Sequence, residues 1–530
     1  MNKITRGGAV VASIAGIALL VSACGASDSG GDSGGDSSQI VIDKSFDLVT
    51  ADPGRMFETT GGIVLHAVYD SLLTFADGDS TTPLPSVASE WSANDDATEY
   101  TFTLRDDITF SDGTALTSAD VVYSLDRVKN LQGNGSFLMS GLSVAAPDDT
   151  TVVITSEAPN TAIPAIVTSP TLGIVNSAVV TENGGASDEG AAESDTAEEF
   201  LNSESAGSGP YVLESFDTTT EVVLTRNEEY WGEAPEYDRV ILRNATAETQ
   251  LQDLQSGTAQ VALDLGSDQT ASLQGNGDLI VSTDVSATMF FLFANANPEI
   301  SDVTSSADFR EAVLYGLDYD GLVELAGEGA ERPGGIVPTT FLGALDSGDA
   351  PQRDIERATA AAERLGDIGT ISLEYASDIS AAGLNFGPFA ERVQANLAEV
   401  GIDIELTPGP VASTLENYRN GAEQMGFWLW NPDYPDPADY LAFGPGGIVG
   451  LRAGWAAGAS PEIESVMAEV STTTDDAARA PLFEEFQTLM NEAGVIFPIV
   501  QPAATVVSSS SVGEVKYDAV FSLDIAAIGK

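Results

Sequence analysis

The chain has 530 residues, of which 43% are hydrophobic and 19% are charged, and its formal net charge is −60. This is the composition of a globular protein with room for two or three domains. So large an acidic surplus would repel a phosphate backbone, which argues against nucleic acid as a partner. The only Gly-Lys pair is Gly529-Lys530. The chain therefore lacks a G-x-x-x-x-G-K-[ST] loop and gives no reason to expect nucleotide hydrolysis.

The N-terminus has the pattern of an export signal. Lys3 and Arg6 precede a mostly apolar run at residues 7–23, which is too short for an ordinary membrane span, so residues 1–23 are predicted to be a signal peptide. The sequence Val-Ser-Ala-Cys-Gly at 21–25 resembles the lipobox of bacterial lipoproteins, whose cysteine is acylated. Cys24 is the only cysteine, and lipidation explains its presence. We expect a lipid anchor on the outer face of the cell membrane, with a plain signal peptide as the alternative.

Residues 24–37 are almost entirely Gly, Ser and Asp, which predicts a flexible tether. Within it, GDSGG at 31–35 matches the string around the nucleophile of trypsin-like proteases. Ser33 would lie in a leader that offers no base and no water-excluding scaffold, so a lipid-anchored hydrolase is disfavoured. The single histidine, His66, lies in an apolar, helix-like run and is read as structural. We expect no catalytic residue, no metal site and no cofactor.

The first part of the body alternates short strands and helices. Residues 39–47 predict a strand, and residues 62–73 predict a helix. At residues 117–124, Thr117 or Ser118 is the expected helix N-cap, with Asp120 in the first turn. The Gly-, Ala-, Ser- and acid-rich segment 182–205 predicts an exposed loop with at most a short helix at 198–201.

The later part predicts a βαβ unit. Residues 371–375 and 402–406 are the expected strands, and residues 388–400 are a helix that ends at Gly401. Two lobes with parallel sheets and a cleft between them follow from this pattern.

A further amphipathic helix is expected at residues 475–492, before a strand at 495–500. The side chains expected on its buried face are Ala478, Leu482, Phe486 and Leu489.

The segment FWLWNPDYPDPADY, residues 427–440, has the composition of a pocket wall. Residues 425–430 predict a strand, which the prolines at 432, 435 and 437 must end. Aromatic faces beside a fixed carboxylate suit a ligand with an apolar body and a cationic head, such as the free α-amino group of a peptide. Asp433 is the first candidate for that carboxylate. The alternative is a proline-rich surface turn whose aromatic residues only cap the core.

Several strings, in their order, resemble the family 5 solute-binding proteins of ABC importers, the class that includes oligopeptide-binding and dipeptide-binding lipoproteins. The resemblance covers nearly the whole mature chain, and most of the strings are read as scaffold. They are Tyr100-Thr101-Phe102-Thr103-Leu104-Arg105, Gly207-Ser208-Gly209-Pro210-Tyr211, Tyr230-Trp231-Gly232, Phe309-Arg310-Glu311-Ala312-Val313 and Asp433-Tyr434-Pro435-Asp436-Pro437.

The resemblance implies an α/β, two-lobed periplasmic-binding-protein-like fold with an additional inserted domain and a hinged cleft. The implied ranges are 38–78, 205–294 and 505–530 for lobe I, 79–204 for the inserted domain II, and 295–504 for lobe II.

The resemblance also implies capture of a small solute, foremost a peptide, and its delivery to an ABC permease by a protein expected to be a monomer. It implies that Asp433 pairs with the α-ammonium group of the peptide and that Trp430 forms a cleft wall, with Trp428 and Tyr434 as further ligand-binding residues. Pro435 withholds a backbone donor. No partner for a ligand carboxylate is evident, and the family also binds sugars, opines and metal chelates. A surface receptor on the same fold is another alternative.

Arg419 and Arg452 are near this segment in sequence only.

Overall fold

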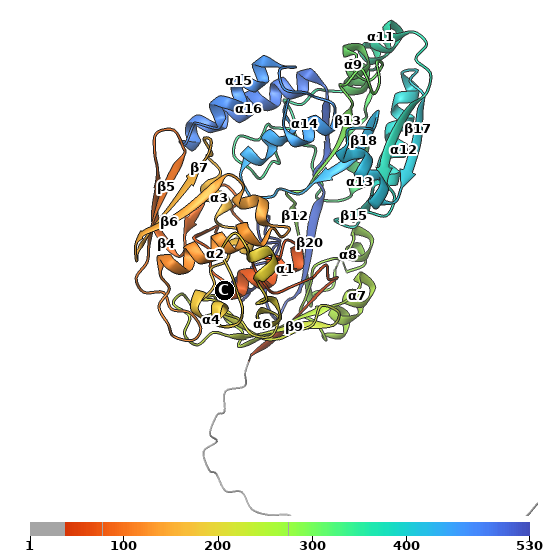
Figure 1. The fold of residues 1–530 in the computed structure, drawn as a ribbon. Helices are drawn as coiled ribbons and strands as arrows, with labels where there is room; N and C mark the ends of the chain where they lie inside the picture. Colours follow the sequence, from red (N-terminus) through yellow and green to blue (C-terminus); the bar gives the residue numbers. More distant parts are fainter. Residues whose placement is uncertain (1–37, 77, 274, 530) are drawn as a thin grey trace, which may run out of the picture. The chain divides into compact units, whose positions relative to one another are not determined.

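The computed structural model describes residues 38–529, apart from Asp77 and Gln274 and the side chain of Asp268. The signal peptide, Cys24, the tether and Ser33 lie outside the described residues. The described part is a mixed α/β structure with two large sheets, a four-stranded sheet and two two-stranded sheets, and Figure 1 shows its ribbon. None of its helices is long and apolar enough to cross a membrane.

The first large sheet has seven strands in the order β12-β20-β11-β1-β10-β9-β8. Its central strand β1 runs parallel to β10 and β11, and the other pairs are antiparallel. The strands are β1 (Gln39–Lys44), β8 (Tyr211–Phe216), β9 (Glu221–Arg226), β10 (Arg239–Asn244), β11 (Val261–Ala262), β12 (Leu279–Val285) and β20 (Ala503–Ser509). The helices that follow these strands are α1 (Thr59–Val68), α7 (Ala247–Ser256) and α8 (Ser267–Leu273).

The second large sheet has five strands in the order β17-β14-β18-β13-β19. They are β13 (Met289–Ala294), β14 (Ile371–Ala376), β17 (Ile404–Gly409), β18 (Met425–Trp430) and β19 (Ile496–Val500). The helices of this region are α9 (Ala307–Gly316), α10 (Tyr319–Ala326), α11 (Ile355–Leu365), α12 (Phe386–Glu399), α13 (Val411–Arg419), η3 (Pro437–Phe443), α14 (Ile448–Arg452), α15 (Pro461–Val470) and α16 (Asp476–Ala493). A two-stranded hairpin of β15 (Ser380–Ala381) and β16 (Leu384–Asn385) precedes α12.

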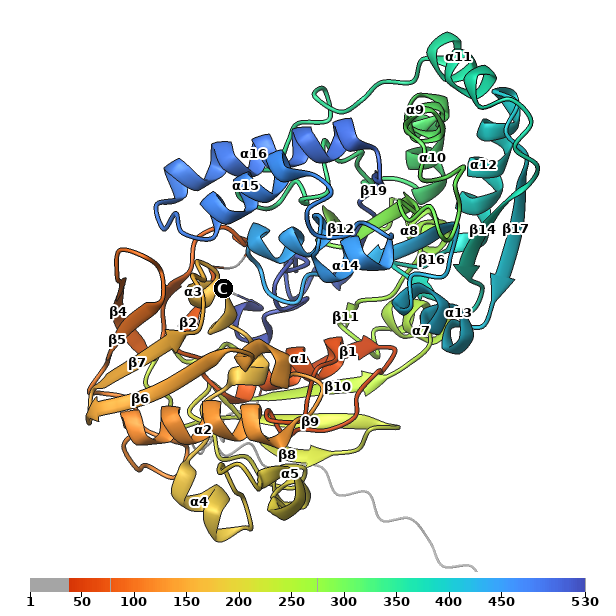
Figure 2. The same cartoon turned by 45° about the horizontal axis from the view of Figure 1, so that its top comes forward.

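The third sheet is antiparallel, in the order β4-β5-β7-β6, and α2 (Ser118–Leu131) packs against β6 (Figures 1 and 2). Its strands are β4 (Ala88–Ala93), β5 (Glu99–Leu104), β6 (Leu142–Asp148) and β7 (Thr151–Ser156). The remaining short elements are β2 (Leu73–Thr74), β3 (Leu84–Pro85), η1 (Ser136–Met139), α3 (Ile163–Ile166), η2 (Pro170–Leu172), α4 (Ser177–Glu182), α5 (Ala191–Ser194), α6 (Glu198–Leu201) and η4 (Ile525–Ala527).

Two stretches of chain connect the large sheets. β12 leads into β13 and β19 leads into β20, while β12 pairs with β20 and β13 pairs with β19, so the two connections run side by side. Ser286 donates its hydroxyl to the carbonyl of Pro502 at 2.7 Å. Gln501, which is fully buried, donates its side-chain amide to the carbonyl of Ser286 at 3.1 Å. The two connections are therefore fastened to each other where they leave the first sheet.

Several predicted elements are confirmed. Thr117 caps α2 in a reciprocal capping box with Asp120, the strand over residues 425–430 is β18, and β14, α12 and β17 form the expected parallel βαβ unit. His66 stacks on Phe521 with ring centroids 3.7 Å apart, as expected of a structural histidine.

A scaffold role is confirmed for two of the family strings, Gly207 to Tyr211 and Tyr230 to Gly232. Ser208 Oγ and Trp231 Nε1 both donate to Asp70 Oδ2, at 2.7 and 2.8 Å. A Cβ atom at Gly207 would lie 2.1 Å from the carbonyl oxygen of Val68, so only glycine fits there.

Other expectations were wrong. Both large sheets are mixed rather than parallel. The expected helix at 62–73 ends at Val68, and Leu73 lies in β2. β13, which the expected boundary at residue 294 gives to lobe I, pairs with β18 and β19 in the second sheet. Asp195, in the segment expected to be an exposed loop, is buried.

The buried face of α16 also differs from the expected one. Of the four side chains expected there, only Phe486 is buried, and Ala478 is exposed. Arg479 and Gln487 are buried instead, because Arg479 pairs with Asp436 and Gln487 donates to the carbonyl of Gly343. Partners from distant segments thus make polar positions part of the core. The buried residues of α16 are Arg479, Phe483, Phe486, Gln487, Met490 and Asn491.

Candidate functional site

The candidate site is the loop that leaves the second sheet after Trp430. β18 is the middle strand of this sheet, and its first four residues are buried. Prolines at 432, 435 and 437 remove backbone donors, so the chain cannot continue in the sheet. The loop closes with η3, whose N-cap Asp436 accepts a hydrogen bond from the amide of Ala438 at 2.8 Å. The strand and the capped turn hold the loop at both ends.

Asp439 links the end of β18 to the loop through hydrogen bonds. Its side chain is buried, and its Oδ2 accepts hydrogen bonds from Trp430 Nε1 at 2.6 Å and from the backbone amide of Asp433 at 3.3 Å. Burial and the neighbouring charge of Asp433 raise the pKa of Asp439 well above its usual value. One carboxyl group therefore fixes both the indole of Trp430 and the backbone of Asp433.

The Asp433 carboxylate has no hydrogen-bonding or ion-pair partner among residues 38–529 as described. The residue is half-buried, and burial raises its pKa to about 6, an effect that the charge of Arg452 partly offsets. A carboxylate without a direct partner, partly removed from water, is stabilised by any cation that can reach it. This arrangement suits an ammonium group.

The other predicted site residues lie in different surroundings. Trp430 is half-buried, and its ring meets Phe443 edge-on, with centroids 5.5 Å apart. Tyr434 is also half-buried and packs against the apolar core around the four-stranded sheet. The structure thus brings Trp430 and Asp433 together through Asp439, while Tyr434 connects the loop to the core around the four-stranded sheet.

The expectation that Trp428 contacts ligand was wrong. Its side chain is 4% exposed, stacks on Tyr418 with centroids 4.5 Å apart, and donates its Nε1 proton to Glu423 Oε2 at 2.9 Å. Trp428 is therefore a residue of the lobe core.

Asp436 is more than a turn residue. Arg479 Nη2 contacts its Oδ1 at 2.6 Å, and the side chains of both residues are almost completely buried. Replacing Asp436 would remove one partner of a buried ion pair, so this residue cannot serve as a neutral control for Asp433.

Sequence reasoning did not identify Asp439 or the charge of Arg452 as parts of the site. Asp439 lies inside the motif, but only its contacts distinguish it from the other acidic residues there. Two surface hollows in the described part lie elsewhere. One, of about 270 Å³, lies along α13 beside Arg419, and the other, of about 590 Å³, is lined by α7, the start of α8 and Gly383 of the hairpin tip.

The comparisons with known proteins agree with this fold. The model of the bacterial extracellular solute-binding proteins, family 5, matches residues 82–446. The chain belongs to this family. It is a solute-binding protein of the kind that serves ABC transporters.

Among curated relatives of this family 5 protein is the probable D,D-dipeptide-binding periplasmic protein DdpA of Escherichia coli K12. The two chains are 28% identical over 463 residues, which cover 85% of this chain and 86% of the relative. Di/tripeptide-binding and glutathione-binding proteins are also among the relatives. All of these are named as binding proteins.

Solved structures share the fold of the family 5 protein. The Helicobacter pylori protein DppA in complex with the peptide STSA has a TM-score of 0.73 at 19% identity, covering 93% of this chain and 98% of that one. NikA of Brucella suis in complex with Fe(III)-EDTA has a TM-score of 0.76 at 20% identity, covering 92% and 99%. The same architecture thus accompanies both a peptide and a metal chelate.

Proposed function

We propose that this protein captures a peptide outside the cytoplasm, with Asp433 pairing with the peptide α-ammonium, and delivers it to an ABC permease. The observation that carries the proposal is the Asp433 carboxylate, which contacts no cation within the described residues. The backbone amide of Asp433 is fixed by Asp439, which also accepts a hydrogen bond from Trp430.

The energetics favour an amine ligand over a neutral one. A charge left alone in a closed, dry site is costly, and pairing it with an ammonium group removes that cost. A ligand without the amine leaves Asp433 unpaired on closure. A site that recognises only the amino terminus and the backbone of a peptide would bind peptides with many different side chains.

Closure is the expected mechanical step. The two fastened connections near Ser286 and Gln501 are the only covalent links between the large sheets within the described chain, as expected of a hinge. Closing the two lobes would exclude water from Asp433 and Trp430, and the closed form would be presented to the permease.

The names of the relatives support a peptide, and the NikA complex supports the alternative of a non-peptide solute on the same fold. A surface receptor that keeps its solute is a further alternative. Mass spectrometry of the solute that copurifies with the protein separates peptide from sugar, opine or chelate.

The test of the proposed site is Asp433→Asn, which keeps the shape and removes the charge. Breaking one side of a buried charge pair typically costs about 3 to 5 kcal/mol, so calorimetry should show peptide affinity reduced at least a hundredfold. N-acetylated peptide should bind the parent protein as weakly as free peptide binds the variant. Equal binding of free and acetylated peptide would exclude Asp433 as the amine partner.

Glu416→Gln is the matched control. Glu416 is an exposed acid on α13 in the same lobe, and its replacement removes the same charge from the surface. It should leave peptide affinity unchanged within about twofold.

The export signal and Cys24 support a lipid anchor on the outer face of the cell membrane. Cys24→Ser should release the protein into the medium, because nothing else in the sequence explains membrane attachment. Cell fractionation with an antibody measures this release. A variant that stays as firmly bound to membranes as the parent would contradict the anchor.

The domain ranges remain part of the proposal, with the first lobe ending before β13. We also expect the protein to work as a monomer, since one two-lobed chain contains both walls of the proposed cleft.

A further inference from the structure

The Asp433 loop leaves the second sheet next to the chain that joins the two large sheets. β18 and β13 are adjacent antiparallel strands, and Trp430 at the end of β18 pairs with Met289 at the start of β13. β19, which leads back to the first sheet, lies on the other side of β13. We call the two connections, residues 286–288 and 501–502, the hinge segments. The loop therefore begins beside both of them.

Two hydrogen bonds join the loop to the first hinge segment. Thr288 donates its hydroxyl to Asn431 Oδ1 at 2.7 Å in an exposed position. Tyr440, which lies in η3, donates its hydroxyl to the carbonyl oxygen of Ala287 at 3.3 Å. Tyr440 and Ala287 are both buried, so water is a poor substitute for this bond and its loss leaves a buried carbonyl unpaired. The bond from Tyr440 is therefore the stronger of the two constraints.

The ring of Tyr440 leads to the second hinge segment. It meets Phe341 edge-on, with ring centroids 6.0 Å apart. Thr339, two residues before Phe341, donates its backbone amide to Gln501 Oε1 at 2.9 Å. One tyrosine thus contacts the first hinge segment through its hydroxyl and a neighbour of the second through its ring.

Asp439 connects Tyr440 to the candidate site. Its carboxyl group accepts a hydrogen bond from the backbone amide of Asp433, and Asp439 and Tyr440 are consecutive residues of the same seven-residue 3-10 helix. An ammonium group that pairs with Asp433 would restrain the loop. A segment bonded to a restrained loop loses part of its own motion, even where no atom is displaced.

We propose that Tyr440 is a positioning residue that ties the Asp433 loop to the hinge segments, so that a ligand bound at Asp433 restrains the chain that bends on closure. This inference rests on the proposed function, in which Asp433 holds an ammonium group and the lobes close about these connections. Tyr440 acts through the loop and not by touching the ligand, since its side chain is fully buried. Such coupling is reciprocal, so a change in the hinge must also alter the loop.

Hydrogen–deuterium exchange of the purified full-length protein, followed by mass spectrometry, tests the tie without a ligand. Tyr440→Phe keeps the ring and removes the hydroxyl, and the amides of residues 286–288 should then exchange about fivefold faster than in the parent. Ser286→Ala removes the hydroxyl that bonds to Pro502. It should in turn speed exchange in residues 431–436 by about threefold.

Tyr211→Phe is the matched control. Tyr211 is a buried tyrosine whose hydroxyl donates to the carbonyl of Tyr237 at 3.1 Å, so its replacement removes the same kind of hydrogen bond. It lies on β8, at the edge of the first sheet opposite β12, from which the chain enters the hinge. Exchange in both segments should stay within about twofold of the parent.

A second arm of the experiment uses trialanine and N-acetyl-trialanine as ligands. Saturating trialanine should slow exchange of residues 286–288 in the parent by about fivefold, and in Tyr440→Phe by less than about twofold. Calorimetry verifies that trialanine still binds the variant. N-acetyl-trialanine lacks the ammonium group and should slow this exchange much less in the parent.

The outcomes separate this inference from the proposed function. Equal hinge exchange in Tyr440→Phe and Tyr211→Phe, or a loop that does not respond to Ser286→Ala, overturns the tie. Hinge amides that trialanine slows equally with and without the tyrosine hydroxyl overturn the transmission. If trialanine does not bind, or if the acetylated peptide acts as strongly, the Asp433 proposal fails, and exchange in the free proteins still decides for or against the tie.

Discussion

Two loops of this protein contain an aspartate close to a proline, and they differ in whether a cation of the protein contacts that aspartate. Asp52, before Pro53, is fully buried, and Arg127 contacts its two oxygens at 2.6 and 2.7 Å. Asp433 is half-buried, and within the described part of the chain no cation touches it.

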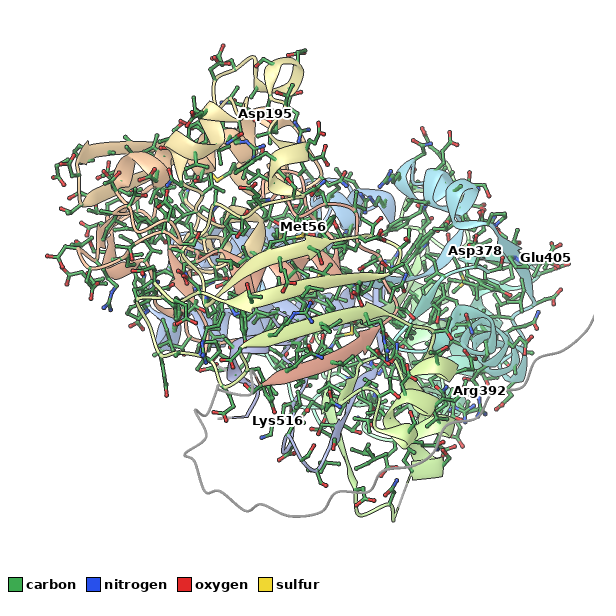
Figure 3. The ribbon with its side chains drawn as sticks, turned by 90° about the horizontal axis from the view of Figure 1, so that it is seen from below. Met56, Asp195, Asp378, Arg392, Glu405 and Lys516 are labelled. Atoms are coloured by element: carbon green, nitrogen blue, oxygen red, sulfur yellow. The ribbon has the colours of Figure 1, made fainter. Side chains whose placement is uncertain are left out.

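The Asp52 loop is a structural joint, by which we mean that ion pairs of Asp52 and Asp195 with Arg127 connect distant segments of the chain. Arg127 lies on α2 and also reaches Asp195 at 2.8 and 3.0 Å, and Asp195, labelled in Figure 3, follows α5. The guanidinium on α2 therefore bonds the loop that precedes α1 to the segment that follows α5. The comparison shows that the residue pattern alone does not separate a structural acid from a binding one. A structural aspartate differs from a ligand-binding one in that the protein itself supplies its cation.

The strongest way to break the comparison is to remove the buried cation of the Asp52 loop. Arg127→Met would leave the buried carboxylates of Asp52 and Asp195 with Arg55 alone, at 3.4 and 3.1 Å, and losing one partner of a buried pair typically costs about 3 to 5 kcal/mol. Chemical denaturation should show this loss in the free energy of unfolding, and Asp52→Asn added to Arg127→Met should recover part of it.

The matched control is Arg353→Met. Arg353 contacts Glu399 at 2.8 Å in a pair of which both side chains are partly exposed, so its loss should cost about 1 kcal/mol or less. Equal effects of the two methionine variants would mean that the Asp52 joint contributes no more than a surface pair.

A third acid sharpens the comparison, because no cation among the described residues pairs with it and its burial keeps a ligand from it. Glu423 is fully buried, accepts a hydrogen bond from Trp428 at 2.9 Å, and has its pKa raised to about 9, chiefly by burial. It is neutral at pH 7. A folded-state pKa above the unfolded value favours folding at low pH, and this contribution is lost as the pH rises toward 9.

Glu423→Gln mimics the neutral acid and removes this pH dependence. Between pH 6 and 8 the parent should lose about 1.4 kcal/mol per pH unit relative to the variant. Comparing the two pH values cancels any constant cost of the amide group. Urea denaturation at both pH values measures the difference, and parallel pH curves for parent and variant would mean that Glu423 is ionised in the fold.

Local patterns predicted local structure well. The capping box of Thr117 and Asp120, the strand at 425–430 and the βαβ unit each depend on residues a few positions apart. Arg127 is 75 positions from Asp52 and 68 from Asp195. No periodicity reports such a pairing, and the composition around Asp195 resembles that of an exposed loop.

For the candidate site, too, the sequence predicted the local features but not the contacts between distant residues. The prolines and aromatic residues indicated a rigid loop, and the family resemblance selected Asp433 and Trp430. Alternation along β18 puts Trp428 and Trp430 on one face, but only packing shows that Tyr418 covers the first and leaves the second half-exposed. Arg452 ends α14 and lies over the ring of Tyr418, and nothing in its local sequence indicates that its charge acts on Asp433.

The last prediction uses the difference between the two loops directly, through the pH dependence of peptide binding. The raised pKa of Asp433, about 6, means that its carboxyl group is mostly ionised at pH 7 and mostly protonated at pH 5. A protonated carboxyl cannot pair with an ammonium group, and the α-amino group of the peptide stays charged throughout this range. Affinity should therefore fall about tenfold from pH 7 to pH 5, because the ionised fraction falls by about that factor.

Asp433→Asn removes the titrating group and should abolish this pH dependence, although its affinity is low at every pH. Calorimetry at constant ionic strength measures both proteins. Affinity that is flat between pH 7 and 5 in the parent would mean that Asp433 stays ionised without a ligand, and the loop would then resemble the Asp52 joint, with its charge already compensated.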